Sequence, residues 1–297
     1  MRIVSLLPSA TEIVFALGLG DQLDGVTFEC DHPAEARSKT VVSGTALPAG
    51  LTDPAEIDRL VTQSMAVEQP IYTLDAERIR TIRPDLILAQ DLCRVCAVPS
   101  GHVEDALDQL GCTAEVLSLD PNTLDDVIAC IGQVGQATGT TDTANQLMRQ
   151  LSARVDAVRT AVANEPRRRL LAIEWADPPF TGGHWVPEMI QAAGATSLLA
   201  DRGQRSRKAT WQEIEQTGPD VVLFIPCGYD LEQAKAQSDE VLRQPALASV
   251  DEIWVADATS YFSRPGPRVV DGVEALAWAL HPNALPEPPS NRIERLR

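Results

Sequence analysis

The stretch Leu170–Gly194, LLAIEWADPPFTGGHWVPEMIQAAG, decides the fold, because an apolar run breaks there into a polar and aromatic loop and then restarts as a helix. Leu170 to Ile173 predicts a buried strand. Pro187 at the first helical position and Gly194 just past the end predict a helix between them. In an open α/β sheet, a strand-to-helix connection lies at the carboxyl edge, where ligands bind. The connection is therefore a candidate binding site.

The loop inside this stretch is rich in aromatic side chains and in side chains that can act as acids, bases or ligands. They are Glu174, Trp175, Asp177, Phe180, His184 and Trp185. Further aromatic residues also fall where predicted strands end, namely Tyr229, Tyr261 and Phe262. Large rings at an open sheet edge contact either a flat or macrocyclic ligand or another part of the protein. Both interpretations stay open from the sequence.

Length and charge limit the class of protein. A chain of 297 residues with 44% hydrophobic content can bury two ordinary cores. The net charge of −17 argues against nucleic acid as a partner, because binding nucleic acid requires a basic surface. The absence of a long apolar run predicts no insertion into a membrane. We therefore expect two globular domains, with neither nucleic acid nor a membrane as partner.

The first residues, MRIVSLLPSATEIVFALG, superficially resemble a signal peptide. Pro8, Ser9 and Glu12 interrupt the apolar run, and Ser9 to Glu12 predicts a capping box that begins a helix ending at Gly18. The amino terminus is therefore expected to be a folded strand and helix. As written, the sequence predicts a cytoplasmic protein, with a periplasmic or cell-surface location only if an upstream export signal is missing.

Apolar runs of strand length alternate with helical patterns along both halves. The predicted strands include Leu23–Phe28, Ile71–Leu74, Leu86–Ala89 and Ile253–Ala256. Such alternation is typical of a parallel sheet covered on both faces. Between the halves, Thr141 to Asn164 carries apolar residues at three- and four-residue spacing and predicts one long amphipathic helix. We expect an α/β protein with two Rossmann-like lobes of mostly parallel strands. The expected segments are lobe 1–139, connecting helix 140–166, lobe 167–282 and a loose tail 283–297.

The two halves repeat short sequence units in the same order. Thr11–Gly18 compares with Pro187–Gly194, and Arg83–Leu88 compares with Gly218–Leu223. Two matches in the same order favour a shared plan for the two lobes.

Cysteines cluster at the ends of predicted strands. Without a secretory signal, all six cysteines are expected to be reduced thiols. Cys93 and Cys96 form a C-x-x-C pair, which either holds a metal, cycles as a redox pair or simply lines a pocket. If the lobes face each other, Cys93, Cys96, Cys227 and His184 make a sulfur-rich set suited to a transition metal.

Catalytic motifs are scarce. Glu174 and Asp177 suggest an acid and base pair for hydrolysis. No G-x-S-x-G elbow, phosphate-binding glycine loop or H-E-x-x-H motif occurs in the sequence. The residues therefore favour a non-catalytic binding protein, with a cytoplasmic metal-binding protein or metal-dependent enzyme as the alternative.

Several stretches carry a resemblance to a known family: Ile3–Glu12, Glu29–Asp31, Asp91–Cys96, Glu174–Phe180, Gly183–Glu188, Pro226–Tyr229 and Tyr261–Pro267. Through them the chain resembles the class III periplasmic binding proteins, which bind cobalamin, haem and iron-siderophores for ABC importers. More narrowly, it is similar to the cobalamin-binding proteins of the vitamin B12-binding type. The resemblance covers about Ile3 to Leu280.

The resemblance implies a ligand held between two lobes with little hinge motion, and docking to an ABC importer if the protein is exported. The ligand would be cobalamin or a similar tetrapyrrole or metal chelate, with Trp175, Trp185 and Tyr261 stacking on it and His184 or a cysteine near the metal. The candidate ligand-binding residues are Ser9, Glu29, Cys30, Asp91, Cys93, Cys96, Glu174, Trp175, Asp177, Phe180, His184, Trp185, Cys227, Tyr229, Tyr261, Phe262 and Arg264.

Overall fold

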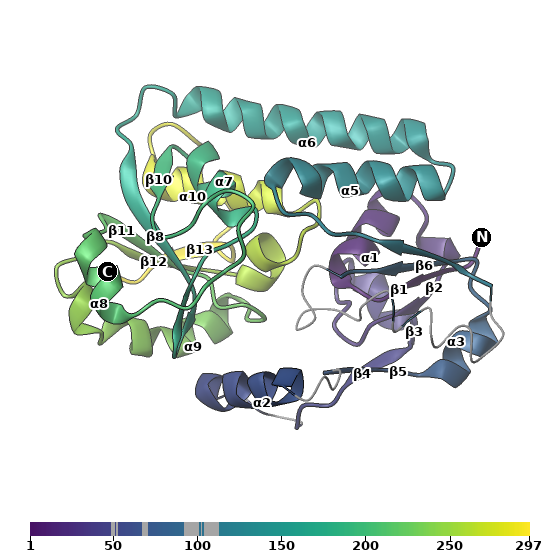
Figure 1. Cartoon of the computed structure of the whole chain (residues 1–297). Helices are drawn as coiled ribbons and strands as arrows, with labels where there is room; N and C mark the ends of the chain where they lie inside the picture. The colour runs from purple at the N-terminus through teal and green to yellow at the C-terminus, as the bar shows by residue number, and fades with distance from the viewer. Residues whose placement is uncertain (49–50, 52, 67–70, 92–100, 102, 104–112) are drawn as a thin grey trace. The chain divides into compact units, whose positions relative to one another are not determined.

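The protein folds into two compact units, shown in Figure 1. This computed structural model describes residues 1–48, 51, 53–66, 71–91, 101, 103 and 113–297. Unit 1 comprises Met1–Asp120 with Ala129–Met148, and unit 2 comprises Pro121–Ile128 with Arg149–Arg297. Each unit contains its own sheet of mostly parallel strands, so the predicted α/β class with two lobes is confirmed.

The unit 1 sheet is parallel and runs in the order β3-β2-β1-β6-β7. Its strands are β1 (Ile3–Ser5), β2 (Leu23–Val26), β3 (Thr40–Val41), β6 (Leu86–Ala89) and β7 (Glu115–Ser118). The central strands β1 and β6 are buried along their whole length, because helices cover both faces of the sheet. Ile79 and Ile82 of α3 pack against one face, where Val4 and Ile87 lie.

The helices of unit 1 follow the sequence pattern, with one correction at the first. They are α1 (Pro8–Ala16), η1 (Gly20–Gln22), η2 (Ala34–Ser38), α2 (Pro54–Ala66) and α3 (Ala76–Ile82). The capping box predicted at Ser9–Glu12 is absent: α1 begins at Pro8, after Leu7 as N-cap, and has no side-chain cap. Proline needs no amide partner in the first turn, so the helix starts earlier than a capping serine would allow.

The apolar run Ile71–Leu74 does form a strand, but not in the parallel sheet. It gives β5 (Tyr72–Leu74), which pairs antiparallel with β4 (Ser43–Thr45) in a separate two-stranded ribbon. Periodicity finds the strand but does not say which strand it pairs with.

The unit 2 sheet runs β10-β8-β11-β12-β13, with β9 paired to β8. Its strands are β8 (Arg168–Ala176), β9 (Pro179–Thr181), β10 (Ala195–Ser197), β11 (Val221–Phe224), β12 (Ile253–Ala256) and β13 (Ile293–Arg295). Strands β10, β8, β11 and β12 are parallel, whereas β9 and β13 are antiparallel to their neighbours.

Helices cover both faces of the unit 2 sheet. They are α7 (Val186–Ala192), α8 (Trp211–Thr217), α9 (Leu231–Leu242), η3 (Pro245–Leu247), a π-helical turn η4 (Thr259–Ser263) and α10 (Val269–Leu280). On one face, Leu171, Phe224 and Val255 of three strands share a buried cluster with α8 and α9. Thr210 and Glu213 form a capping box at the start of α8.

The stretch Leu170–Gly194 contains a β-hairpin where the sequence predicted a loop. Strand β8 extends to Ala176, and after a turn at Asp177 and Pro178 the chain returns as β9, antiparallel to β8. Pro179 begins this edge strand, a position where proline's missing amide hydrogen is tolerated. The helix that follows spans Val186–Ala192, and Gly194 takes a positive φ of 86° just beyond it, as its position predicts.

The segment 283–297 is not entirely loose, which corrects the prediction. Ile293–Arg295 forms β13, antiparallel to β12. The Arg297 guanidinium donates to the carbonyl oxygens of Leu242, Leu247 and Val250. A run with few apolar residues is thus held by backbone pairing and one buried contact at Ile293.

Two long helices each belong to both units. Helix α5 (Leu124–Ala137) passes from unit 2 to unit 1 after Ile128, and α6 (Thr141–Ala161) returns to unit 2 after Met148. The compact units therefore differ from the predicted segments, which divide at 139 and 166: the chain passes between the units once in the loop before α5 and once each within α5 and α6.

The predicted repeat has a structural counterpart. Asp85 exchanges hydrogen bonds with the backbone of Arg2, its carboxylate accepting from the amide nitrogen at 2.7 Å and its own amide donating to the carbonyl at 2.8 Å. Asp220 makes the same pair with Arg169, at 2.8 and 2.9 Å. In each unit this aspartate, at the entry to one strand, fixes the start of the neighbouring strand.

Candidate functional site

The carboxyl edge of the unit 2 sheet presents an aromatic pair. The rings of Trp175, on β8, and Tyr229, after β11, lie 6.0 Å apart between centroids and are tilted by 30°. Backbone hydrogen bonds hold this edge together: Cys227 donates to the carbonyl of Glu174, and Thr259 donates to the carbonyl of Tyr229. The neighbouring strands β8, β11 and β12 thus bring the two rings together at the carboxyl edge of the sheet.

Trp175 Nε1 and Thr259 Oγ1 are buried at this edge and have no hydrogen-bond partner among the residues that the structure describes. A buried donor without a partner costs free energy, which a ligand with a carbonyl or amide oxygen would recover. Cys227, by contrast, is an exposed free thiol. The edge therefore combines ring surface, a thiol and unsatisfied donors.

Glu174 braces the loops beside this aromatic pair. Its carboxylate accepts a hydrogen bond from the Gly183 amide at 3.2 Å and one from the Ser206 hydroxyl. A Cβ added at Gly183 would lie 2.1 Å from the Ser206 amide nitrogen, so only glycine permits this approach. The contacts give Glu174 a structural task, and its predicted partner Asp177 is exposed in the hairpin turn.

His184 lies in the same loop with a left-handed backbone, at φ 53°. Its amide donates to the carbonyl of Gln204, and its carbonyl accepts from Gly203. The imidazole Nε2 is buried and has no hydrogen-bond partner within the described residues. Burial lowers the pKa of His184, and the nearby Arg205 guanidinium lowers it further, so the neutral ring is favoured.

Three of the predicted contact residues are buried against neighbours within unit 2. Trp185 Nε1 donates to the carbonyl of Phe262 at 2.7 Å, and Phe262 is 1% exposed. The guanidinium groups of Arg268 and Arg292 each lie over the Tyr261 ring, at 5.7 and 5.2 Å from its centroid. These rings therefore support the loop and η4, while Trp175 and Tyr229 remain half-buried at the edge.

Phe180 and Arg264 flank this region. The Phe180 ring lies under the Lys208 ammonium at 5.4 Å, and Phe180 also bridges to Lys208 through the backbone. Arg264 is half-buried just after η4. Asp257, at the end of β12, accepts from the Ser260 amide at 2.8 Å. Burial raises the pKa of Asp257, and the hydrogen bonds from Ser260 oppose this rise.

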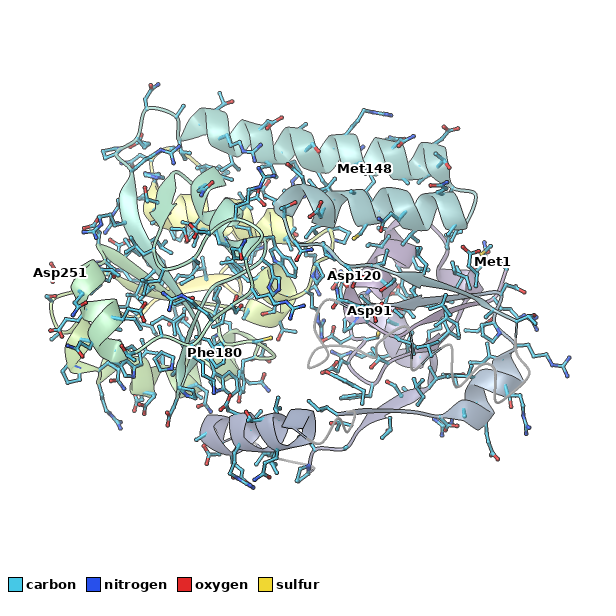
Figure 2. The ribbon with its side chains drawn as sticks, viewed as in Figure 1. Met1, Asp91, Asp120, Met148, Phe180 and Asp251 are labelled. Atoms are coloured by element: carbon cyan, nitrogen blue, oxygen red, sulfur yellow. The ribbon has the colours of Figure 1, made fainter. Side chains whose placement is uncertain are left out.

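The carboxyl edge of the unit 1 sheet carries the other predicted residues. Ser9 is 2% exposed, and the Cys30 thiol is buried beside the Thr11 hydroxyl at 3.0 Å. Glu29 accepts a hydrogen bond from the Tyr72 hydroxyl at 3.4 Å. Asp91 accepts from the Ser118 hydroxyl at 2.9 Å, next to Asp120 (Figure 2).

Phe28 is a residue that sequence reasoning missed. It is 43% exposed, and its ring centroid lies 6.1 Å from that of Tyr72. Phe28 was assigned to the end of a strand, but β2 ends at Val26, so the ring falls in the edge loop. An exposed phenyl ring beside a tyrosine is a candidate ligand contact. The signal that could have found Phe28 was its position just after the end of a strand.

The predicted metal set is only half described. Cys93 and Cys96 lie outside the described residues, so the prediction of a site with Cys227 and His184 stays untested. Among the residues that the structure describes, no group of three or more His, Cys, Asp or Glu side chains is placed to hold a metal ion.

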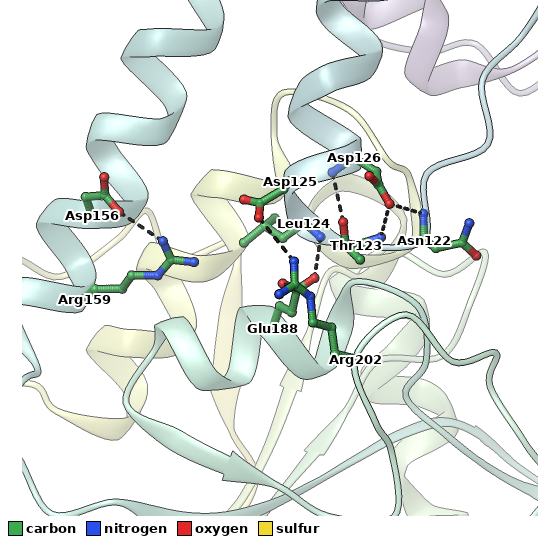
Figure 3. Close-up of polar contacts among 9 residues, drawn as sticks. All are labelled: Asn122, Thr123, Leu124, Asp125, Asp126, Asp156, Arg159, Glu188 and Arg202. Atoms are coloured by element: carbon green, nitrogen blue, oxygen red, sulfur yellow. Dashed lines mark hydrogen bonds and ion pairs between the residues drawn. The ribbon is translucent and has the colours of Figure 1, made fainter.

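A carboxylate cluster fixes the segment that precedes α5 to unit 2, as Figure 3 shows. Glu188 of α7 accepts a hydrogen bond from the Leu124 amide at 2.7 Å and pairs with Arg202 at 2.9 Å. Asp126 accepts from the Thr123 amide and donates its own amide to the Thr123 hydroxyl, a capping box at the start of α5. The cluster holds α7, the helix after the candidate loop, in place.

The two-lobed α/β fold is that of a known class of binding proteins, and a family comparison agrees. A family model described as "Periplasmic binding protein" matches residues 3–251. The chain therefore belongs to the periplasmic binding protein family. This membership confirms the prediction of a non-catalytic binding protein, and it does not support the alternative of a metal-dependent enzyme.

Individual relatives cover nearly the whole chain. A vitamin B12-binding protein of Vibrio cholerae is 27% identical and matches 94% of this chain and 88% of its own length. An uncharacterized ABC transporter substrate-binding lipoprotein of Bacillus subtilis is 25% identical, with 96% and 82% covered. The periplasmic haem-binding protein RhuT of Roseiflexus has the same fold, with a TM-score of 0.69, 23% identity, and 95% and 98% covered.

These relatives correct the expected cytoplasmic location. The haem-binding protein RhuT is periplasmic and the Bacillus subtilis relative is a lipoprotein, which contradicts the prediction of a cytoplasmic protein. The first residues do fold as β1 and α1, but a folded start is no evidence of location. Within the described ranges, no helix is both long enough and apolar enough to span a bilayer.

Proposed function

We propose that this protein binds cobalamin, or a similarly flat metal chelate, and delivers it to an ABC importer. The observation that carries the proposal is the half-buried pair of Trp175 and Tyr229, with Trp175 Nε1 lacking a partner in the described structure. A flat macrocycle offers ring surface for stacking, and the amide groups around a corrin offer acceptors for the indole N–H. The vitamin B12-binding relative supports this ligand class.

His184 is proposed as the residue nearest the metal of the chelate. An imidazole nitrogen that is buried and has no partner in the described part of the chain is suited to ligate cobalt or iron. Haem is the second candidate ligand, because Arg205 lies near His184 and would pair with a propionate.

The test is a titration of purified protein with aquocobalamin and with haem, followed by visible absorption and thermal stability. We expect cobalamin to bind, and Trp175→Ala to weaken binding at least tenfold, since stacking of one flat base on an aromatic side chain already contributes about 1–3 kcal/mol. Trp278→Phe is the control, because Trp278 contacts Trp254 and not the strand edge. His184→Asn should remove any shift of the absorption band while leaving the fold intact, since asparagine tolerates a positive φ.

The outcomes separate the candidates. Binding of haem alone would replace cobalamin as the ligand. If neither chelate binds, or if Trp175→Ala and Trp278→Phe bind equally well, the proposed site is wrong.

A further inference from the structure

An open hollow lies at the amino edge of the unit 1 sheet, the edge opposite the one that carries the predicted ligand-binding residues. Its volume is about 460 Å³, and it is lined by Arg2, Arg80, Thr81 and Arg83. Arg2 precedes β1 and Arg83 precedes β6, two neighbouring parallel strands. Phe28 and Asp91 follow strands of the same sheet, so the hollow and the candidate site are separated by the length of the strands.

The hollow is rich in unneutralised positive charge. Arg2 has a carboxylate partner, Asp85, at 3.7 Å. Within the described residues, the guanidinium groups of Arg80 and Arg83 make neither an ion pair nor a hydrogen bond. In a chain with 42 acidic residues and a net charge of −17, most surface arginines could find a carboxylate. Two unpaired cations beside one hollow repel each other unless an anion joins them.

The end of α3 explains only part of this arrangement. Arg80 lies in the last turn of α3, where a cation is favoured by the helix dipole. Arg83, however, is the C-cap with a left-handed φ of 52°, a conformation that favours glycine. Unit 2 has Gly218 at the matching position, with φ 55°. The repeat thus shows that this position does not require arginine for folding.

The matching place in unit 2, by contrast, has an arginine whose guanidinium group is paired. There the Arg169 guanidinium donates to the Thr217 carbonyl at the end of α8. The arginines of unit 1 therefore form a feature of their own, and not a by-product of the shared fold.

We propose that the hollow lined by Arg2, Arg80 and Arg83 binds a phosphate-bearing polyanion. Guanidinium groups donate paired hydrogen bonds to phosphate oxygens, and several of them together favour a multivalent anion over chloride or acetate. The same chemistry fits a free polyphosphate or a phospholipid headgroup. Three arginines are fewer than the roughly four to eight cations of clusters that bind anionic membranes, so a headgroup would orient the protein without anchoring it.

The test compares three proteins: wild type, Arg80→Gln/Arg83→Gly, and the control Arg37→Gln/Arg149→Gln. The control removes the same charge at two exposed positions that do not line the hollow. Arg83→Gly suits the left-handed backbone and keeps the fold, which far-UV circular dichroism and unchanged chelate binding would verify. Each protein is titrated with sodium tripolyphosphate by calorimetry, and sedimented with phosphatidylglycerol or phosphatidylcholine vesicles.

We expect the wild type and the control to bind tripolyphosphate, and the Arg80→Gln/Arg83→Gly variant to bind at least tenfold more weakly. Loss of sedimentation with phosphatidylglycerol, but not of tripolyphosphate binding, would identify the headgroup as the source. The proposal is overturned if wild type binds neither probe, or if the variant binds both as tightly as the control does.

Discussion

At the scale of single residues, Glu188 shows how one buried carboxylate supports the candidate loop. Its side chain is 8% exposed and is held by the Leu124 amide and Arg202. We predict that Glu188→Ala lowers the free energy of unfolding by roughly 1–3 kcal/mol, because the buried Leu124 N–H loses its acceptor. Urea denaturation followed by tryptophan fluorescence measures the change.

Glu188→Gln is the matched control, since its amide oxygen still accepts from Leu124 while the charge on Arg202 loses its partner. Arg202 is 57% exposed, so that loss is screened by water. The glutamine variant should therefore retain most of the stability. Equal destabilisation by both substitutions would show that the ion pair, and not the capping hydrogen bond, is the important contact.

Asp257 gives a pH dependence with a definite sign. Because burial raises its pKa in the folded state above the ordinary value of about 3.9, the folded state binds the proton more tightly than the unfolded state does. The contribution to stability is present below that value and is lost as the pH rises through the raised pKa.

Asp257→Asn should remove this contribution while keeping an acceptor for the Ser260 amide. The difference in unfolding free energy between wild type and variant, measured by urea denaturation from about pH 3.5 to 7, should favour the variant increasingly as the pH rises. A difference that does not change with pH would mean that Asp257 has the same pKa in both states.

Sequence predicted the residue types of the site better than their tasks. Trp175 and Tyr229 were placed at strand ends from local pattern, and the structure finds them paired there. Glu174 was given acid and base chemistry, but its partners Gly183 and Ser206 come from loops whose packing no local pattern reveals. Phe28 was missed because a strand two residues shorter than expected moved it into a loop.

At the scale of elements, the contacts of Arg297 hold the carboxyl-terminal strand. Its guanidinium donates to carbonyls at the end of α9 and around η3, with distances of 2.9 to 3.1 Å. We predict that Arg297→Ala lowers unfolding stability by roughly 1–3 kcal/mol, since buried carbonyls lose charged donors. Arg297→Lys should recover part of it, because lysine reaches fewer carbonyls than the guanidinium fork does.

Hydrogen exchange supplies the measurement that fits this prediction. The amides of β12 and β13 should exchange faster in Arg297→Ala, while those of the unit 1 sheet keep the wild-type rate. Unchanged protection of β13 would contradict the assigned task of Arg297.

Strands were predictable where apolar runs were long and both faces were buried. Leu86–Ala89 and Ile253–Ala256 match their predicted bounds, because each is apolar throughout. The short edge strands β9 and β13 were missed, since they hold one or two apolar residues and depend on a partner strand. The same limit explains why Ile71–Leu74 was predicted as a strand but not as part of a separate ribbon.

At the scale of the whole molecule, the net charge of −17 makes a prediction about salt. Raising NaCl from about 0.01 to about 0.1 M shortens the screening length from about 30 to about 10 Å. Self-repulsion among surface carboxylates should fall, so the midpoint of urea unfolding should rise. Sucrose, which has no charge, controls for general solute effects.

A fall of the urea-unfolding midpoint with added NaCl would contradict this prediction. It would mean that ion pairs such as Arg154 with Asp271 and Glu274, at 2.6 and 2.7 Å, outweigh the repulsion. These groups are partly buried, so salt screens them less than it screens the exposed carboxylates.

The path of the chain through α5 and α6 restricts how such proteins can be recombined. A fragment that begins at Arg149 lacks Pro121–Ile128 and therefore leaves Glu188 without the Leu124 amide. A chimera that joins the ligand-binding half of one relative to the other half of a second must exchange both stretches together. A single crossover between the two stretches would take Glu188 from one relative and the α5 terminus that it contacts from another. We therefore expect functional recombinants to keep both stretches from the same relative.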